Sequence, residues 1–155
     1  MEPAKILVVD DEPSILRLLQ EALSQWGYQV TCASTAREAL AALSTELFDA
    51  ALTDVRMPDM GGLDLLREIK KQDESIEVIV MTGYPTISSA VEALKEGAYD
   101  YLSKPLILDE LRPLMTRLME RRFLRGEDAV ALKEQDEDGE KQYEKQPGCS
   151  RAPSA

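Results

Sequence analysis

Several residues able to bind a metal ion or a phosphoryl group follow directly after short apolar runs. They are Asp10 and Asp11 after residues 6–9, Asp54 after 50–53, Thr82 after 78–81, and Lys104 after 99–103. Short apolar runs bounded by polar residues are typical of buried strands. In an open parallel α/β sheet, ligands bind outside the carboxyl ends of the strands. We therefore expect three carboxylates, a hydroxyl and an ammonium group to meet at one edge of a sheet.

These side chains predict a magnesium and phosphoryl site. Asp54 is the candidate nucleophile, because a carboxylate can form an aspartyl-phosphate intermediate. Magnesium prefers oxygen ligands and is usually held by one or two carboxylates together with phosphate oxygens. Without a cation, Asp10, Asp11 and Asp54 would repel one another. Thr82 offers a hydrogen bond donor and Lys104 a positive charge to the phosphoryl oxygens, where charge develops during transfer.

Each of these residues also has a purely structural interpretation. A single aspartate after a strand is usually a turn or cap residue, and adjacent acids before Pro13 favour a helix N-terminus. Thr82 can cap a turn, and Lys104 can be solvated. For any one residue we prefer the structural interpretation. Four strand ends that all carry the chemistry of one reaction are hard to explain by chance, so for the set we favour the site.

Strand-like runs alternate with longer amphipathic segments. The predicted strands are 5–9, 28–32, 50–53, 78–81 and 99–103, and the predicted helices lie around 13–26, 36–43, 63–69, 87–94 and 108–124. Pro58, Gly61 and Gly62 mark a loop before the third helix. Strict alternation implies βαβ units and a parallel sheet. The sequence therefore predicts an α/β fold with five strands and five helices.

Local signals refine the ends of these elements. Gly27 is placed for a left-handed helix C-cap, and Thr35 with Glu38 has the spacing of a capping box. Pro113 lies past the first turn of the last helix, where it predicts a kink or a late helix start. The Lys104–Pro105 bond can adopt the cis form, which would turn Lys104 sharply towards the site.

Composition excludes several classes of protein. The net charge of −11 over 155 residues argues against a nucleic-acid-binding surface. The short basic cluster near the end of the last helix is interpreted as a solvated helix terminus, and it consists of Arg117, Arg121, Arg122 and Arg125. Histidine is absent, which removes imidazole ligands and bases. Cys32 and Cys149 make neither a disulfide framework nor a zinc site.

The chain shows no signal for a membrane. Its N-terminal residues do not predict a signal peptide, and no apolar stretch approaches the roughly 18 residues that a membrane helix needs. We expect a cytoplasmic protein that does not bind membranes. From residue 126 onwards acidic residues dominate and apolar ones are few. We predict a folded domain at 4–125 and an acidic, flexible tail at 126–155.

Four motifs in these positions resemble receiver domains of two-component response regulators. They are VVDDE at 8–12, LTDVRMP at 52–58, VMTG at 80–83 and SKP at 103–105. The resemblance covers residues 4–125 and implies a flavodoxin-like, doubly wound parallel sheet with strand order 2-1-3-4-5. MTGYPT at 81–86 and EGAYDYL at 96–102 look most like receivers of alternative-sigma-factor activators of the nitrogen-regulation type.

The resemblance implies that Asp54 accepts a phosphoryl group from a phosphohistidine of a sensor histidine kinase or phosphotransfer protein. Asp11 and the backbone carbonyl of Arg56 would bind Mg²⁺ (or Mn²⁺) beside Asp54, with Asp10 acting largely through water. The protein would catalyse its own phosphorylation and dephosphorylation and would be a signalling protein, not a metabolic enzyme. Arg56 and Tyr84 occupy positions where receivers vary, so the lifetime of the phosphoryl group stays open.

The family also implies a conformational switch. Thr82 and Lys104 would contact the phosphoryl group, and Tyr101 would turn inward as Thr82 moves. The structural interpretation of Tyr101 is a half-buried strand tyrosine with its hydroxyl in water. The output surface would be the helix at 87–94, the strand at 99–103 and the helix at 108–124, a frequent homodimer face in this family.

Three alternatives remain open. Sigma-factor activators normally continue into an ATPase and a DNA-binding domain, but no Walker-type loop follows here. The chain is either a stand-alone receiver or a receiver fragment of such an activator, and the natural-looking tail favours the stand-alone receiver. A haloacid-dehalogenase-like phosphatase uses similar residues, but its nucleophile sits on the first strand. The third alternative is a docking module that binds its partner equally well whether or not it is phosphorylated.

Overall fold

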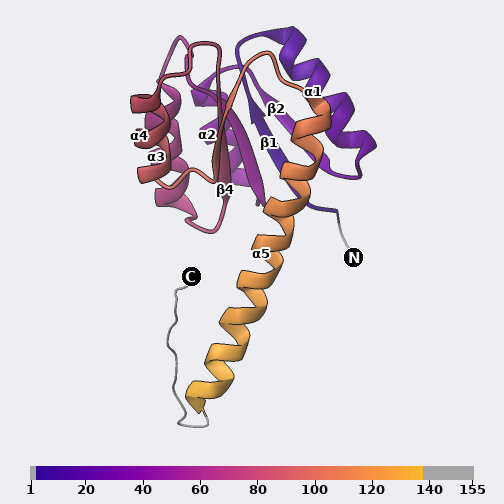
Figure 1. Cartoon of the computed structure of the whole chain (residues 1–155), viewed down its shortest axis with the longest axis vertical. Coiled ribbons are helices and arrows are strands. Elements are labelled where there is room, and N and C mark those ends of the chain that lie inside the picture. Colours follow the sequence, from indigo (N-terminus) through magenta and orange to yellow (C-terminus); the bar gives the residue numbers. More distant parts are fainter. Residues whose placement is uncertain (1–2, 138–155) are drawn as a thin grey trace. The chain divides into compact units, whose positions relative to one another are not determined.

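The computed structural model describes residues 3–137, in which strands and helices alternate throughout (Figure 1). The strands are β1 (Lys5–Val9), β2 (Gln29–Ala33), β3 (Ala50–Asp54), β4 (Glu77–Thr82) and β5 (Asp100–Ser103). The helices are α1 (Pro13–Gln25), α2 (Ala36–Thr45), α3 (Gly62–Gln72), α4 (Ile87–Lys95) and α5 (Leu108–Glu137). The predicted order of elements is confirmed, and their bounds agree to within a few residues except at the end of α5.

All five strands are parallel and follow the order β2-β1-β3-β4-β5. This confirms the doubly wound topology. The register pairs Val9 with Thr53 and Asp54 with Met81, and it pairs Thr82 with the last residue of β5. The strands β1, β3, β4 and β5 therefore end at one edge of the sheet, where the predicted site residues lie.

The three central strands are buried on both faces. Residues 6–9, 50–52 and 78–81 have no exposed surface. Figure 1 shows α1 and the start of α5 on one side of the sheet and α3 with α4 on the other. A parallel sheet covered by helices on both faces needs strands that are continuous apolar runs. This is the pattern from which the strands were predicted.

The predicted Gly27 cap of α1 is confirmed, and the predicted capping box of α2 is confirmed in part. Gly27 ends α1 at a φ of +98° and Gly97 ends α4 at +105°, a region that glycine adopts without strain. Thr35 caps α2, because its Oγ1 accepts a hydrogen bond from the Glu38 N–H at 3.1 Å. The Glu38 carboxylate accepts instead from the Ser34 N–H at 2.8 Å. Glu38 thus binds the residue before the cap and not the cap itself.

The last helix differs from the prediction. It begins at Leu108 and contains Pro113, so the alternative prediction that the helix starts late, at the proline, is wrong. The predicted kink at Pro113 stays a prediction. The first turn of the helix forms before the proline. In this turn the N–H groups of Glu110 and Leu111 both donate to the Ile107 carbonyl at 3.0 Å. The predicted end near residue 124 is also wrong, since α5 continues to Glu137. Residues 126–137 contain Ala, Leu, Glu, Lys and Gln, which all favour helix.

Some expectations fall outside what is described. Residues 138–155 and Cys149 lie beyond the described part of the chain, so the flexible tail and the domain boundary at 125 stay predictions. Cys32 is a free cysteine. Within residues 3–137, none of the helices combines the length and apolarity needed to cross a bilayer.

Candidate functional site

The five predicted site residues lie together at the carboxyl edge of the sheet. Asp10 and Asp11 follow β1, Asp54 and Thr82 end β3 and β4, and Lys104 follows β5. One carboxylate oxygen from each of the three aspartates lies within 4.8 Å of the others. The common ends of the parallel strands produce this convergence. The geometry predicted from the sequence is therefore observed.

Lys104 lies at the centre of the acidic cluster. Its Nζ is 2.7 Å from Asp10 Oδ2, 3.2 Å from Glu12 Oε1 and 3.4 Å from Asp54 Oδ1. Asp10 is fully buried and Asp54 is 6% exposed, and a buried carboxylate is costly unless it is paired. Glu12 was not among the predicted site residues. Because Glu12 directly follows Asp10 and Asp11 in the sequence, its contribution to the acidic cluster could have been predicted.

The cluster perturbs the protonation of Asp54 and Lys104. Burial and then the negative charge of Asp10 raise the pKa of Asp54, while Lys104 and the Arg56 N–H act in the opposite direction without cancelling the rise. Burial lowers the pKa of Lys104, but the hydrogen bond and charge of Asp10, together with Asp54 and Glu12, outweigh burial and leave it raised. Lys104 therefore keeps its proton, whereas Asp54 ionises less readily than a free aspartate.

The donor set suits a hard divalent cation. The three aspartates offer only oxygen atoms, which Mg²⁺ and Mn²⁺ accept as ligands. Three negative charges face one ammonium, so Lys104 alone does not neutralise the cluster. Asp11 is exposed and opens the cluster to solvent. The residues present thus fit the predicted Mg²⁺.

Backbone contacts fix Thr82 beside the cluster. Its side chain is buried, and its Oγ1 accepts from the Tyr84 N–H at 3.0 Å. Its carbonyl accepts from the Lys104 N–H at 2.7 Å, which ties the ends of β4 and β5 together. The Lys104–Pro105 bond is cis. The Thr82 hydroxyl is an acceptor in its bond with Tyr84 and keeps a proton that it can donate.

Residues 6–116 match the family described as the response regulator receiver domain. The chain belongs to this family. It is 46% identical over 114 residues to the transcriptional regulatory protein ZraR of Escherichia coli K12, a match that covers 74% of this chain and 26% of ZraR. The chain therefore spans about a quarter of the length of the curated relatives it matches.

Solved receiver structures share the fold. A CheY-like receiver from Methanospirillum hungatei JF-1 has a TM-score of 0.77 at 33% identity, covering 80% of this chain and 99% of that one. The beryllofluoride-activated NtrC4 receiver dimer has a TM-score of 0.73 at 36% identity, covering 76% and 98%. The resemblance to receivers of the nitrogen-regulation type is confirmed. A dehalogenase-like phosphatase is not supported.

The loop after β3 places Arg56 over the receiver site. The Arg56 N–H lowers the pKa of the Asp54 carboxyl, against the larger effects that raise it. Its guanidinium lies over the ring of Tyr84, 4.4 Å from the ring centroid, which is a cation–π distance. The two variable positions noted in the sequence thus contact each other at the mouth of the site. The role of the Arg56 carbonyl as a metal ligand stays a prediction.

Gly62, which was predicted only to mark a loop, lies against the backbone of Asp54. A Cβ on Gly62 would lie 2.3 Å from the Asp54 carbonyl oxygen and 2.7 Å from Val55 Cα. Its N–H donates to the Val55 carbonyl at 2.8 Å. The first residue of α3 must therefore be glycine for the helix to begin this close to the end of β3.

Tyr101 is half-buried on β5 and packs against the core. Its hydroxyl forms a hydrogen bond with the Ser89 hydroxyl of α4. The hydroxyl is therefore bound by protein, not left to water as the structural interpretation would have it. The bond joins β5 to α4 inside the predicted output surface. The switch role of Tyr101 stays a prediction.

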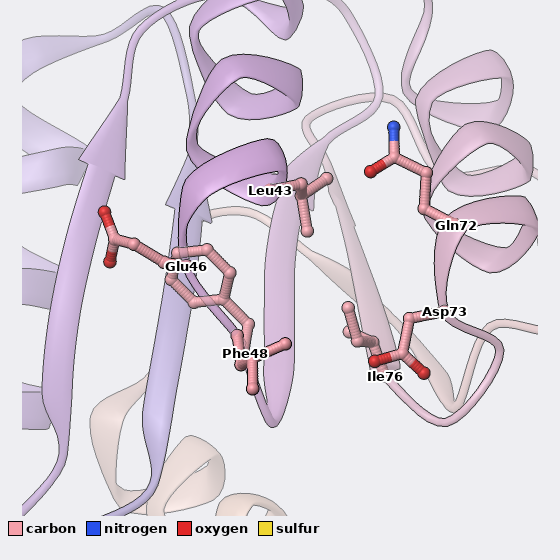
Figure 2. Close-up of a pocket in the computed structure, with 7 residues that line it drawn as sticks. Leu43, Glu46, Phe48, Gln72, Asp73 and Ile76 are labelled. Atoms are coloured by element: carbon pink, nitrogen blue, oxygen red, sulfur yellow. The ribbon is translucent and has the colours of Figure 1, made fainter.

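A separate hollow of about 140 Å³ lies at the opposite edge of the sheet, between the connections that lead into β3 and β4 (Figure 2). Both acidic residues that line the hollow interact with neighbouring residues of the protein. Glu46 lies 3.0 Å from Lys5 Nζ and accepts from Thr31, and Asp73 accepts from the Ser75 N–H. The hollow contains none of the predicted site residues.

Proposed function

We propose that Asp54 accepts a phosphoryl group from the phosphohistidine of a sensor histidine kinase or phosphotransfer protein. A carboxylate oxygen of Asp54 forms a bond to phosphorus while the phosphorus–nitrogen bond breaks, and its electron pair returns to the imidazole. Water later cleaves the acyl phosphate at the same site. The convergence of Asp10, Asp11 and Asp54 around Lys104 is the observation that supports this proposal.

The neighbouring side chains serve the phosphoryl oxygens and the metal. Asp11, Asp54 and the Arg56 carbonyl would hold Mg²⁺, with Asp10 acting largely through water. When bound, the ion neutralises phosphoryl charge so that an anionic carboxylate can approach. Lys104 lies closer to Asp10 than to Asp54, at 2.7 against 3.4 Å. It would turn from Asp10 to a phosphoryl oxygen, and the Thr82 hydroxyl would bind a second one.

The output surface would include α4, β5 and the start of α5. Ala93 is the one fully buried residue of α4, whereas α3 buries four. A helix with few buried contacts can shift at low cost. Helix α4 carries three exposed apolar side chains, and they are Ile87, Val91 and Leu94. Phosphorylation would move Thr82 and Tyr101 and so change how this surface binds a partner or a second copy.

The test is treatment of the full chain with acetyl phosphate and Mg²⁺, followed by intact-mass analysis. We expect one labile phosphoryl adduct on the wild type and on Asp109→Asn, which changes an exposed aspartate on α5. We expect none on Asp54→Asn or when a chelator removes Mg²⁺. An adduct that survives Asp54→Asn would move the acceptor to another residue.

A further inference from the structure

Asp59 lies in the loop between β3 and α3, but its carboxylate caps a different helix. Its Oδ1 accepts from the Ala36 N–H at 3.1 Å, and its Oδ2 accepts from the Arg37 N–H at 2.9 Å. Thr35 accepts from the next donor, the Glu38 N–H. The first donors of a helix have no partner within the helix. At α2, two of them are satisfied from a loop more than 20 residues along the chain.

The charge of Asp59 suits this position. A negative charge near a helix N-terminus interacts favourably with the helix dipole. The N–H groups of Arg37 and Ala36 hold the pKa of Asp59 below its usual range. The carboxylate is therefore ionised at neutral pH, and both of its oxygens are used as acceptors. The contact is a two-point bridge between a loop and a helix.

The loop that Asp59 anchors also forms one wall of the acidic site. At its start, the Val55 N–H donates to the Met81 carbonyl at 2.9 Å, and at its end the Gly62 N–H donates to the Val55 carbonyl at 2.8 Å. Arg56 lies between these points, two residues after Asp54 and three before Asp59. Asp59 ties this middle stretch to α2.

We propose that Asp59 is a positioning residue for the acidic site. By bridging the β3–α3 loop to the N-terminus of α2, it holds the backbone at Arg56 in place and so sets the affinity of the site for a divalent cation. This inference rests on the proposed function, because it concerns the same site. Partners that orient the groups around a metal typically change its affinity about 10–100-fold when they are removed.

A simpler role for Asp59 is to stabilise α2 alone. Thr35→Ala separates the two roles, because it removes a cap of α2 without touching the β3–α3 loop. Asp73→Asn is a matched control for the loss of a loop carboxylate. Asp73 also accepts a backbone N–H, that of Ser75, but it lies at the opposite edge of the sheet.

The experiment measures two properties of the full chain. Titration with Mg²⁺ alone gives the cation affinity, and amide hydrogen exchange without Mg²⁺ gives the protection of the Arg56 N–H. For Asp59→Ala we expect the affinity to fall by about 10-fold and the Arg56 amide to exchange faster. Asp59→Asn keeps one acceptor oxygen and should fall between Asp59→Ala and wild type. This milder variant also serves if Asp59→Ala does not fold.

Two results would overturn the proposal. One is an unchanged Mg²⁺ affinity and Arg56 protection in both Asp59 variants. The other is an equal loss of affinity in Thr35→Ala, which would reduce Asp59 to a helix cap. If the wild type takes up no phosphoryl group from acetyl phosphate, the proposed function is wrong, but cation affinity and Arg56 exchange still test Asp59.

Discussion

At the scale of single residues, the site is an excess of carboxylates around one ammonium. Lys104 contacts Asp10, Glu12 and Asp54, and Asp11 lies within the same cluster. Burial makes this excess costly, because a desolvated carboxylate is stable only when it is paired. Under the proposed function, a bound divalent cation would offset that cost by neutralising part of the negative charge.

The raised pKa of Asp54 predicts a pH-dependent stability. The folded state binds this proton more tightly than the unfolded state does, because of burial and the charge of Asp10. The resulting stabilisation is present at pH values below the unfolded pKa and is lost as pH rises through the folded pKa. Without Mg²⁺, Asp54→Asn, which mimics the neutral acid, should raise Tm by a few degrees at pH 7.

Thermal unfolding between pH 4 and 7 checks this prediction, with Asp109→Asn as the control. The gain of Asp54→Asn over wild type should shrink as pH falls towards about 4, the usual pKa of an unfolded aspartate. Mg²⁺ should stabilise wild type more than Asp54→Asn. A gain that is the same at every pH would contradict the assignment of the effect to Asp54.

At the scale of elements, the site depends on how closely α3 begins to β3. Gly62 lets the helix start against the Asp54 carbonyl, and the preceding loop then carries Arg56 and Asp59. On its other side, α3 is linked to α4 by Arg67, which lies 3.1 Å from Glu96. Helix α3 thus contacts both the end of β3 and the proposed output surface.

Gly62→Ala should therefore damage both stability and the site. The added Cβ would meet backbone atoms of Asp54 and Val55, which cannot move aside as a flexible side chain can. We expect a loss of about 1–3 kcal/mol in the free energy of unfolding, typical of overpacking. Urea titration measures it, and Mg²⁺ titration should show weaker binding.

The neighbouring glycine provides the control for this prediction. A Cβ on Gly61 would meet only Asp64 Oδ2 at an ordinary 3.8 Å, and its φ of −66° suits any residue. Gly61→Ala should change the free energy of unfolding by no more than about 1 kcal/mol. Equal losses in the two variants would show that the close approach of α3 to β3 is unimportant.

At the scale of the whole molecule, one sheet edge carries the acidic cluster, and α4 carries exposed apolar side chains. The chain has a net charge of −11, so two copies repel each other over long range. Salt screens that repulsion. Self-association through α4 and β5 would therefore depend on apolar contact and be favoured by phosphorylation and by moderate salt.

An exposed isoleucine and an exposed leucine of similar size, on different parts of the surface, offer a matched test of self-association. Ile87 on α4 is 86% exposed, and Leu47 at the opposite edge is 85% exposed. With beryllofluoride and Mg²⁺, we expect gel filtration to show a dimer for wild type and Leu47→Glu but a monomer for Ile87→Glu. A wild type that stays monomeric, or equal behaviour of the two variants, would rule out a dimer through α4. Dimerisation of Asp54→Asn to the same extent would support the docking module.

Differences from the sequence prediction fall where local signals compete. Pro113 removes one hydrogen bond, but the first turn of α5 forms around the Ile107 carbonyl regardless. The acidic stretch after residue 125 was assigned to a tail from its charge, although its residue types also favour helix. Glu38 was placed correctly for a capping box but had the Ser34 N–H within reach as well.

The sequence by itself determined the order of elements, the sheet topology through family resemblance, and the candidate residues Asp10, Asp11, Asp54, Thr82 and Lys104. These depend on apolar periodicity and on which residues follow each strand, and both are local along the chain. Only the tertiary structure revealed that Glu12 shares Lys104, that Tyr101 binds Ser89 and that Asp59 caps α2. Those contacts join elements distant in sequence, so strand register and side-chain direction decide them.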